Sequence, residues 1–302
     1  WAEEEACLSY TYDQALALLV FSQHGRWAEA DAIVDVFAQL QNPDGSWFQV
    51  HDCNLSPPLP TPSAPKWEGD IAWMTVALGQ YQRLGGTHPS AEAMQLAAAD
   101  WLATQLNSQD GCLMIDHTEG TIDSWWALES AWPAYQDEVK GLENCLLTYY
   151  WDEPMGRFKG GREWYQPYLD NQTWGAAFLK AIGEDEKAKQ ALSYAYETLR
   201  LPTSGGELYG FDGQGGPWAL WNEGTGQYVA VGGYRANDLL AELLAQQRPD
   251  GAMPSAPHNF SGAGVWSQNW HGVSSTAWLV LALNQFAFHR MEQNLYLPLV
   301  TN

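Results

Sequence analysis

The sequence predicts an all-α protein, a closed (α/α) toroid of about six antiparallel helix hairpins. Apolar residues recur at helical spacing along most of the chain, and the helical stretches come in pairs joined by short glycine-containing turns. Polar, aromatic-rich segments return at one side of the pairs, as a central funnel would require. An open superhelical solenoid is the alternative, but this one-sided recurrence favours a closed ring.

The helical stretches form five pairs, and chain ends or loops would complete an imperfect sixth. In the last pair, Gly232 and Gly233 predict a break or kink, because glycine weakens the interior of a helix. The predicted helices are Tyr12–Phe21 with Trp27–Leu40, Gly69–Leu84 with Ser90–Leu106, Thr121–Tyr135 with Asp137–Tyr149, Asp170–Ile182 with Glu184–Leu199, and Gly224–Gln247 with Gly272–Phe288.

The turns after the helices repeat a common chemistry. Proline or an Asp-Gly pair ends the preceding helix, and glycine supplies the left-handed conformation that the chain reversal needs. We interpret residues 1–302 as one domain, with residues 290–302 as a C-terminal tail or strap and with long loops at Asn54–Lys66 and Ser204–Gly216. The repeated turns are Gln41–Trp47, Gln109–Met114, Trp151–Phe158 and Gln247–Met253.

The charge balance excludes two classes of partner. Fourteen basic residues oppose 36 acidic ones, for a formal net charge of −22, so the basic footprint of a nucleic-acid-binding protein is missing. An anionic membrane surface would repel the protein, and the sequence has no apolar run long enough for membrane insertion. The acidity suits a solvated shell on an exported protein, a cleft that concentrates carboxylates, or both.

The aromatic content points to a carbohydrate partner. The chain has 17 Trp and 14 Tyr, and several of them stand beside Gly, Asp or Glu in loop-like stretches rather than in apolar stripes. Flat rings beside carboxylates suit sugars, which pair an apolar face with hydroxyl edges. The alternative is that large rings fill wide gaps between helices, and it would account for about half of them.

The cysteines do not predict a metal site. Cys7, Cys53, Cys112 and Cys145 lack zinc-ligand spacing and would form up to two disulfides or remain thiols. No cofactor is expected, although so many carboxylates are compatible with a bound calcium ion. Sequons at Asn54, Asn171 and Asn259 and a start at Trp1 rather than Met are typical of a secreted or cell-surface protein whose signal peptide is not visible.

Five motifs resemble those of six-hairpin (α/α) toroid glycosidases and their secreted relatives. The resemblance covers nearly the whole chain as a pattern of helix pairs and loops, and it implies a sugar-cleaving protein on a toroid. The turn Gln41–Trp47 is also similar to a turn of terpene cyclases, but their Asp-x-Asp-Asp and Asp-Asp-x-x-Asp motifs are missing. The five motifs are Tyr12–Ala15, Trp67–Trp73, Thr118–Asp123, Leu169–Trp174 and Trp221–Gly226.

Four carboxylates are candidates for catalysis, because glycoside cleavage needs one carboxyl as acid and another as base or nucleophile. Glu223 follows a Gly-rich loop between aromatic residues, where desolvation would raise its pKa, and we expect it to be the acid. Glu119 would precede its helix and point inward. Asp70 and Asp123 are catalytic candidates too, but helix capping explains either of them equally well.

Eight further residues are candidates for contacts with a sugar. Among these, Asp170 is explained equally well as a helix cap, and His271 as an ordinary satisfied polar residue. Trp125 is expected to form a sugar platform, while its neighbour Trp126 would anchor the core. The substrate-binding candidates are Tyr12, Asp13, Trp73, Trp125, Asp170, Trp174, Trp221 and His271.

The leading functional hypothesis is a glycoside hydrolase acting on a poly- or oligosaccharide. The resemblance implies inversion, which needs carboxyl groups roughly 6.5–9.5 Å apart. The alternative is a non-catalytic carbohydrate-binding or structural protein of the cell surface. The acidic exterior and the apolar tail Asn294–Val300 would suit an extracellular assembly, although that tail could instead close the ring. A polysaccharide lyase ranks last, because arginine is scarce and an acidic funnel repels acidic sugars.

Overall fold

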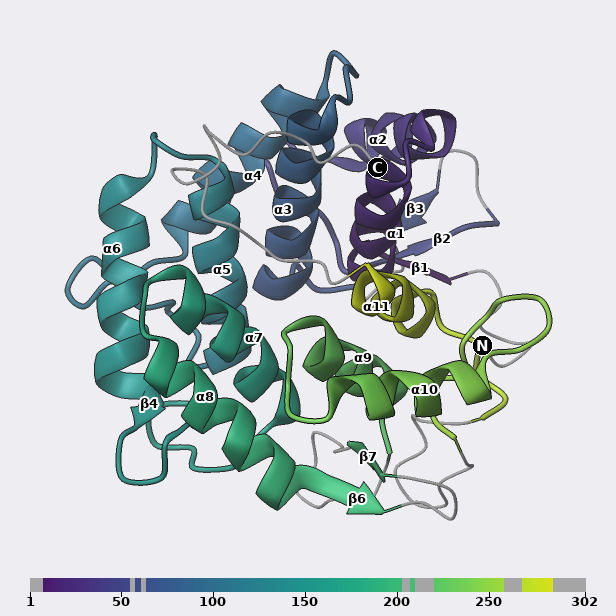
Figure 1. Ribbon diagram of the computed structural model, residues 1–302. Coiled ribbons are helices and arrows are strands. Elements are labelled where there is room, and N and C mark those ends of the chain that lie inside the picture. Colours follow the sequence, from purple (N-terminus) through teal and green to yellow (C-terminus); the bar gives the residue numbers. More distant parts are fainter. Residues whose placement is uncertain are drawn as a thin grey trace.

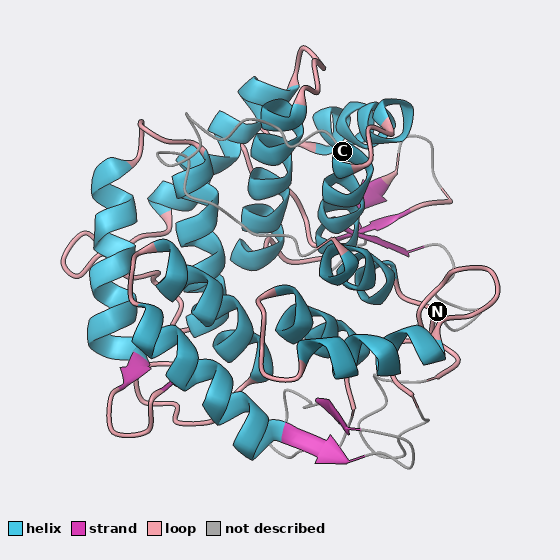
Figure 2. Ribbon diagram, viewed as in Figure 1, coloured by secondary structure: helices cyan, strands magenta, loops and turns pink. Residues whose placement is uncertain are grey.

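The computed structural model describes residues 8–54, 58–60, 64–202, 207–209, 220–257 and 268–284. Helices dominate this part of the chain, as Figure 2 shows. The α-helices are α1 (Thr11–Gln23), α2 (Trp27–Leu40), α3 (Glu68–Leu84), α4 (Ala91–Thr104), α5 (Thr118–Ser130), α6 (Gln136–Cys145), α7 (Leu169–Ala181), α8 (Asp185–Tyr194), α9 (Asn222–Ala230), α10 (Ala236–Gln246) and α11 (Val273–Leu283).

The odd-numbered helices form a closed inner ring. In sequence order α1, α3, α5, α7, α9 and α11 each contact the next, and α11 returns to contact α1 (Figure 1). The even-numbered helices α2, α4, α6, α8 and α10 each pack against the helix that precedes them, so they form an outer layer. The contact between α1 and α11 confirms the predicted toroid and excludes the open solenoid.

One predicted helix is two helices. The stretch Gly224–Gln247 divides into α9 and α10, and Gly232 and Arg235 adopt positive φ values of 75° and 58° in the turn between them. The predicted pairing of that stretch with Gly272–Phe288 was therefore wrong, because α9 and α10 are themselves the fifth hairpin. Helix α11 begins the sixth. The chain after it, including the predicted tail at residues 290–302, lies outside the described residues.

Helix α5 begins three residues earlier than the sequence predicts. The imidazole Nδ1 of His117 accepts a hydrogen bond from the backbone N–H of Gly120, at 3.1 Å, and so caps the helix. Glu119 therefore lies in the first turn of α5 and not before it. This corrects the expectation that Glu119 precedes the helix, and the reason is that histidine is an uncommon cap.

The strands are short and lie at the edge of the helical ring (Figure 2). They form a three-stranded antiparallel sheet ordered β1-β2-β3 and two hairpins, β4-β5 and β6-β7. The outer helices α6 and α8 each continue into a π-helical turn, η2 or η3, before these hairpins. Their bounds are β1 (Leu8–Tyr10), β2 (Val50–Asp52), β3 (Leu59–Pro60), η2 (Leu146–Tyr150), β4 (Trp151–Asp152), β5 (Arg157–Phe158), η3 (Ala195–Leu199), β6 (Arg200–Pro202) and β7 (Glu207–Tyr209).

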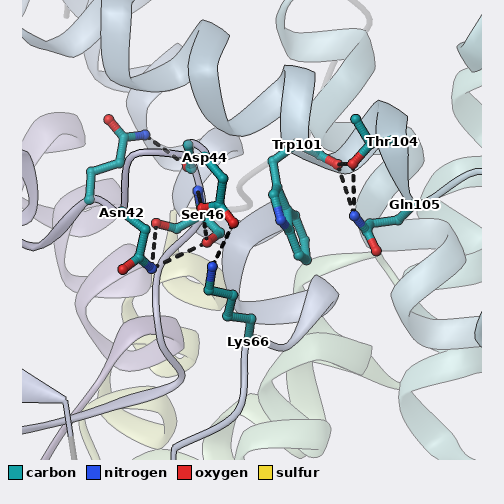
Figure 3. A network of polar contacts seen from close by, with 9 residues as sticks. Asn42, Asp44, Ser46, Lys66, Trp101, Thr104 and Gln105 are labelled. Carbon is teal, nitrogen blue, oxygen red and sulfur yellow. Dashed lines mark hydrogen bonds and ion pairs between the residues drawn. The ribbon is translucent and has the colours of Figure 1, made fainter.

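The turn after α2 is held by its own polar groups (Figure 3). The backbone N–H of Asn42 donates to the carbonyl oxygen of Ser46, at 2.9 Å, and the N–H of Ser46 donates to Asp44 Oδ1, at 3.2 Å. Lys66 Nζ lies 2.6 Å from Asp44 Oδ2, which ties the turn to the segment entering α3. Gly45 has a φ of 89°, as the Asp-Gly pair predicts.

Two of the four cysteines form a disulfide. Cys112 and Cys145 join the turn after α4 to the end of α6, which is the outer helix of the next hairpin. The bond therefore ties neighbouring hairpins together on the outside of the ring.

Candidate active site

Acidic side chains from successive inner helices gather at one end of the toroid. Asp13, Asp70, Glu119, Asp170 and Glu223 lie in the first turns of α1, α3, α5, α7 and α9. Asp123 lies one turn further along α5. Helix N-termini carry partial positive charge, which favours carboxylates at these positions. We call Asp13, Asp70, Glu119, Asp123, Asp170 and Glu223 the carboxylate ring, because many of them shift each other's pKa values.

Four tryptophans close the centre of the toroid one turn below these carboxylates. Trp73 of α3 stacks on Trp174 of α7, with ring centroids 4.7 Å apart. Trp278 of α11 meets both rings edge-on, and Trp126 of α5 lies 5.5 Å from Trp174. These helices are not all neighbours in the ring, so their side chains meet near its axis. All four residues are at most 5% exposed. We call Trp73, Trp126, Trp174 and Trp278 the indole floor.

Glu223 is buried and held by hydrogen-bond donors. Its Oε1 accepts a hydrogen bond of 2.6 Å from the hydroxyl of Tyr12, whose oxygen in turn accepts one of 2.9 Å from Trp278 Nε1. Burial raises the pKa of Glu223 to about 7, although the hydrogen bonds from Tyr12 and Ser274 act in the opposite direction. Tyr12 thus links the indole floor to the carboxylate ring.

Ser274 is a site residue that the sequence analysis missed. It lies in the first turn of α11, where the other inner helices described above carry a carboxylate. Burial raises the pKa of Asp13 to about 6, and hydrogen bonds from the backbone and side chain of Ser274 limit that rise. The same side chain also bonds Glu223. A serine without a motif around it gave no signal in the sequence.

Asp70 and Asp123 are the most deeply placed aspartates. Asp70 accepts hydrogen bonds from the backbone N–H of Tyr12, at 3.2 Å, and from the Gln49 amide, at 3.3 Å, while burial raises its pKa to about 7. Burial and the charge of Asp170 raise the pKa of Asp123 well above its usual value. The N-cap residues of α3 and α5 are Trp67 and His117, so neither aspartate is the N-cap residue of its helix. Asp70 does bond its own backbone N–H in the first turn of α3.

Glu119 lies at the water-exposed side of the carboxylate ring rather than in the core. Its side chain is 41% exposed, yet desolvation, followed by the charges of Asp170, Asp123, Glu223 and Asp70, raises its pKa well above the usual value. Water therefore reaches this carboxyl although other carboxylates crowd it. Asp170 is half-buried, and burial raises its pKa to about 6.

His117 is a second site residue without a sequence signal. Its Nδ1 is the acceptor from Gly120, and burial lowers the pKa of the imidazole, so the neutral ring carries its proton on Nε2. That nitrogen lies 3.9 Å from Glu119 Oε2. The cap therefore directs an N–H group toward a carboxyl of the ring.

Within the described residues, no group of three or more His, Cys, Asp or Glu side chains is arranged to hold a metal ion. No helix in the described part of the chain is long and apolar enough to span a membrane.

Comparison with known proteins finds structural likeness without sequence likeness. No protein-family model matches the chain, and no curated protein matches its sequence. Cellobiose 2-epimerase from Bacillus thermoamylovorans B4167 has a similar structure, with a TM-score of 0.71 and 10% identity over 92% of this chain and 88% of that one. A wild-type glycosidase (TM-score 0.70, 12% identity, 92% and 87%) and a D-mannose isomerase (0.65, 14%, 92% and 88%) are also similar.

The chain is an (α/α)6 toroid. At identities this low, the likeness to these glycoside hydrolase-like structures shows the fold alone.

In this toroid, three residues predicted to bind sugar belong neither to the carboxylate ring nor to the indole floor, and they do not link the two as Tyr12 does. Trp125 is fully buried between Trp126 and Phe178, a place that suits a core anchor and corrects its predicted role as a platform. Trp126, the predicted core anchor, is 3% exposed within the hydrophobic core, and it also belongs to the indole floor. Trp221 precedes α9 and packs closely on Gly224. His271 lies near Arg248 and Asp250, whose charges act on its pKa.

Proposed function

We propose that this protein is a glycoside hydrolase whose reaction takes place in the carboxylate ring above the indole floor. Cleavage of a glycosidic bond passes through a transition state with positive charge on the sugar ring. Ionised members of the carboxylate ring would stabilise that charge, while the stacked rings of Trp73 and Trp174 below them would give the site an apolar base. This gathering of carboxylates is the observation that supports the proposal.

Two of these carboxyl groups have environments that suit opposite roles. Glu119 is surrounded by other carboxylates, which favour its protonated form, and it is open to solvent. Glu223 accepts hydrogen bonds from Tyr12 and Ser274, which stabilise its ionised form. We assign Glu119 as the general acid and Glu223 as the base that activates water, with inversion of configuration. This assignment reverses the role that the sequence favours for Glu223.

The same charges argue against sugar epimerisation or isomerisation, the reactions named for two similar structures. Removing a proton next to a carbonyl group creates negative charge, which needs cations or hydrogen-bond donors nearby. In the described first turns of the inner helices, the charged side chains are carboxylates. Hydrolysis fits this field better. The similar structures also include a glutamate-to-alanine variant of a glycosidase in complex with glucose.

The proposal is tested with Glu119→Gln and Glu223→Gln on a panel of oligosaccharides. Each substitution should lower kcat by about 10²- to 10⁴-fold while the melting temperature stays close to the wild-type value. The control is Glu68→Gln. Glu68 is also buried in the first turn of α3, but no ring carboxylate is among the groups that shift its pKa. This control should keep wild-type activity.

The two roles are separated by chemical rescue. Glu119→Gln should recover most of its activity on a glycosyl fluoride, because fluoride leaves without a proton, whereas Glu223→Gln should not. Azide should restore turnover to Glu223→Gln by replacing the activated water, and NMR of the product should show the inverted glycosyl azide. If the glycosyl fluoride instead restored Glu223→Gln and azide restored Glu119→Gln, the two catalytic roles would be exchanged. A wild-type protein that binds sugars but releases none would leave only the carbohydrate-binding alternative.

A further inference from the structure

Exposed apolar side chains gather at the two segments that enter α5 and α7. Met114 and Ile115 precede α5 and are 63% and 44% exposed. Trp164 and Tyr165 precede α7 and are 44% and 58% exposed. Because these segments lead into the first turns that carry Glu119 and Asp170, they lie at the end of the toroid where the carboxylate ring opens. We call Met114, Ile115, Trp164 and Tyr165 the rim patch.

The two segments are joined to each other by hydrogen bonds. The backbone N–H of Thr118 donates to the carbonyl oxygen of Gly160, at 3.0 Å, and the N–H of Arg162 donates to Asp116 Oδ1, at 2.9 Å. Helices α5 and α7 are also neighbours in the inner ring (Figure 1). The two segments that carry the four exposed side chains are therefore adjacent.

The aromatic residues of the rim patch are held in place although they are exposed. The carbonyl oxygen of Trp164 accepts hydrogen bonds from the backbone N–H groups of Gly160 and Gly161, at 2.8 and 3.1 Å, and its ring meets Tyr168 edge-on at 5.1 Å. The Lys159 ammonium lies 5.1 Å above the ring of Tyr165. Large rings that are fixed before a ligand arrives lose little entropy on binding.

The segment that carries Met114 and Ile115 ends at a residue that approaches the carboxylate ring. This residue is His117, whose Nε2 lies 3.9 Å from Glu119 and whose ring meets Trp67 edge-on, with centroids 5.5 Å apart. At Gly69, a side-chain Cβ would come within 3.2 Å of the Trp67 indole and 3.1 Å of Asp123 Oδ2, so these two groups flank the same glycine. The segment of the rim patch that enters α5 thus leads to the candidate catalytic residues.

We propose that the rim patch binds further sugar rings of an uncharged oligosaccharide whose reacting bond lies in the carboxylate ring. The reaction part of this inference rests on the proposed function, and the binding part does not. Stacking on Trp164 and Tyr165 would hold sugar faces. Arg162 is already paired with Asp110, at 2.7 Å, and Lys159 Nζ already donates to the carbonyl oxygen of Arg162, at 2.7 Å. The carboxylate ring would repel an acidic sugar, and the one ammonium of Lys159 would offset only part of that repulsion.

The test measures how affinity depends on oligosaccharide length. Gluco-, xylo- and manno-oligosaccharides from the disaccharide to the hexasaccharide are titrated by calorimetry into Glu223→Gln, which prevents turnover, with and without Trp164→Ala. The affinity of the Glu223→Gln parent should rise with length, and adding Trp164→Ala should remove that gain, a loss of roughly two- to tenfold for the longer sugars and none for the disaccharide. The control is Tyr234→Ala, because Tyr234 is 66% exposed in the turn after α9, beyond that helix's C-terminal end.

The outcomes separate this inference from the proposed reaction. If the length-dependent gain in affinity disappears in Trp164→Ala while the wild-type protein hydrolyses nothing, the rim patch is a sugar-binding site and the hydrolase proposal fails. If Trp164→Ala matches its parent at every length, or if no oligosaccharide in the panel binds, the rim patch is not a sugar site. Equal losses in Tyr234→Ala and Trp164→Ala would also overturn it.

Discussion

At the scale of single residues, Tyr12 controls the ionisation of Glu223. Its hydroxyl donates to Glu223 and stabilises the carboxylate, so Tyr12→Phe should raise the pKa of Glu223 above its value of about 7. Because the proposed base must be ionised, the acidic limb of the kcat/KM profile should move to higher pH. The measurement is a pH–rate profile of both proteins. If the acidic limb does not move, the ionisation that controls kcat/KM is not that of Glu223.

His117 has two functions that substitution can separate. Asparagine can keep the cap, because its side-chain oxygen also accepts from the Gly120 N–H, whereas alanine cannot. His117→Ala should therefore lose about 1 kcal/mol of unfolding free energy, and His117→Asn much less, by chemical denaturation. If both variants are equally unstable, the imidazole stabilises the fold by more than its cap. Equal losses of activity in both would implicate the Nε2 group that approaches Glu119.

At the scale of elements, two turns with one hydrogen-bonding pattern differ in what surrounds them. Gly45 and Gly251 have φ values of 89° and 90°, but a Cβ at Gly45 would lie 2.0 Å from the carbonyl oxygen of Ala97, whereas none of the described atoms lies within 4 Å at Gly251. Gly251→Ala should lower the free energy of unfolding by about 1 kcal/mol, because only the left-handed conformation is unfavourable for alanine there. Gly45→Ala should lower it by about 3 kcal/mol or more, because the new Cβ also meets Ala97. Urea denaturation measures both, and equal losses would show that α4 moves aside freely.

The sequence predicted these elements well where one rule governs them. Apolar periodicity placed all the inner helices, and acidic residues beside glycine marked the first turns of α3, α5 and α9. The prediction from sequence failed where contacts between residues far apart in the chain decide a residue's place or role. His117 caps α5 against common preference. The break at Gly232 and Gly233 was predicted and is confirmed, but the sequence did not show that the two helices on either side of it form one hairpin. Ser274 belongs to the site only because closure of the ring brings α11 beside α1 and α9.

At the scale of the whole molecule, the carboxylate ring makes stability depend on pH. Burial raises the pKa values of Asp13 and Asp170 to about 6 and those of Asp70 and Glu223 to about 7, so the folded state holds protons that the unfolded chain releases. Their contribution to stability is complete below their unfolded pKa values of about 4 and is lost as pH rises through about 6 to 7. The melting temperature should therefore fall between about pH 5 and pH 8.

Asp70→Asn tests the origin of that fall. Its amide oxygen still accepts from the Tyr12 N–H, but the group no longer titrates, so the melting temperature should depend less steeply on pH than in the wild type. Asp250→Asn is the control, because hydrogen bonding to Ala252 lowers the pKa of that exposed aspartate and its contribution has the opposite sign. Identical slopes in wild type and Asp70→Asn would assign the effect to the overall net charge of −22.

The indole floor also limits how a long polymer can be processed. Because the rings of Trp73, Trp174 and Trp278 contact one another across the axis, a polysaccharide strand cannot pass through the centre of the toroid. A sugar that enters from the end that carries the carboxylate ring has to leave from the same end. Under the proposed hydrolysis, this block at the axis would favour trimming of chain ends over cuts in the middle of a strand, and each released sugar would have to leave before the shortened chain advances.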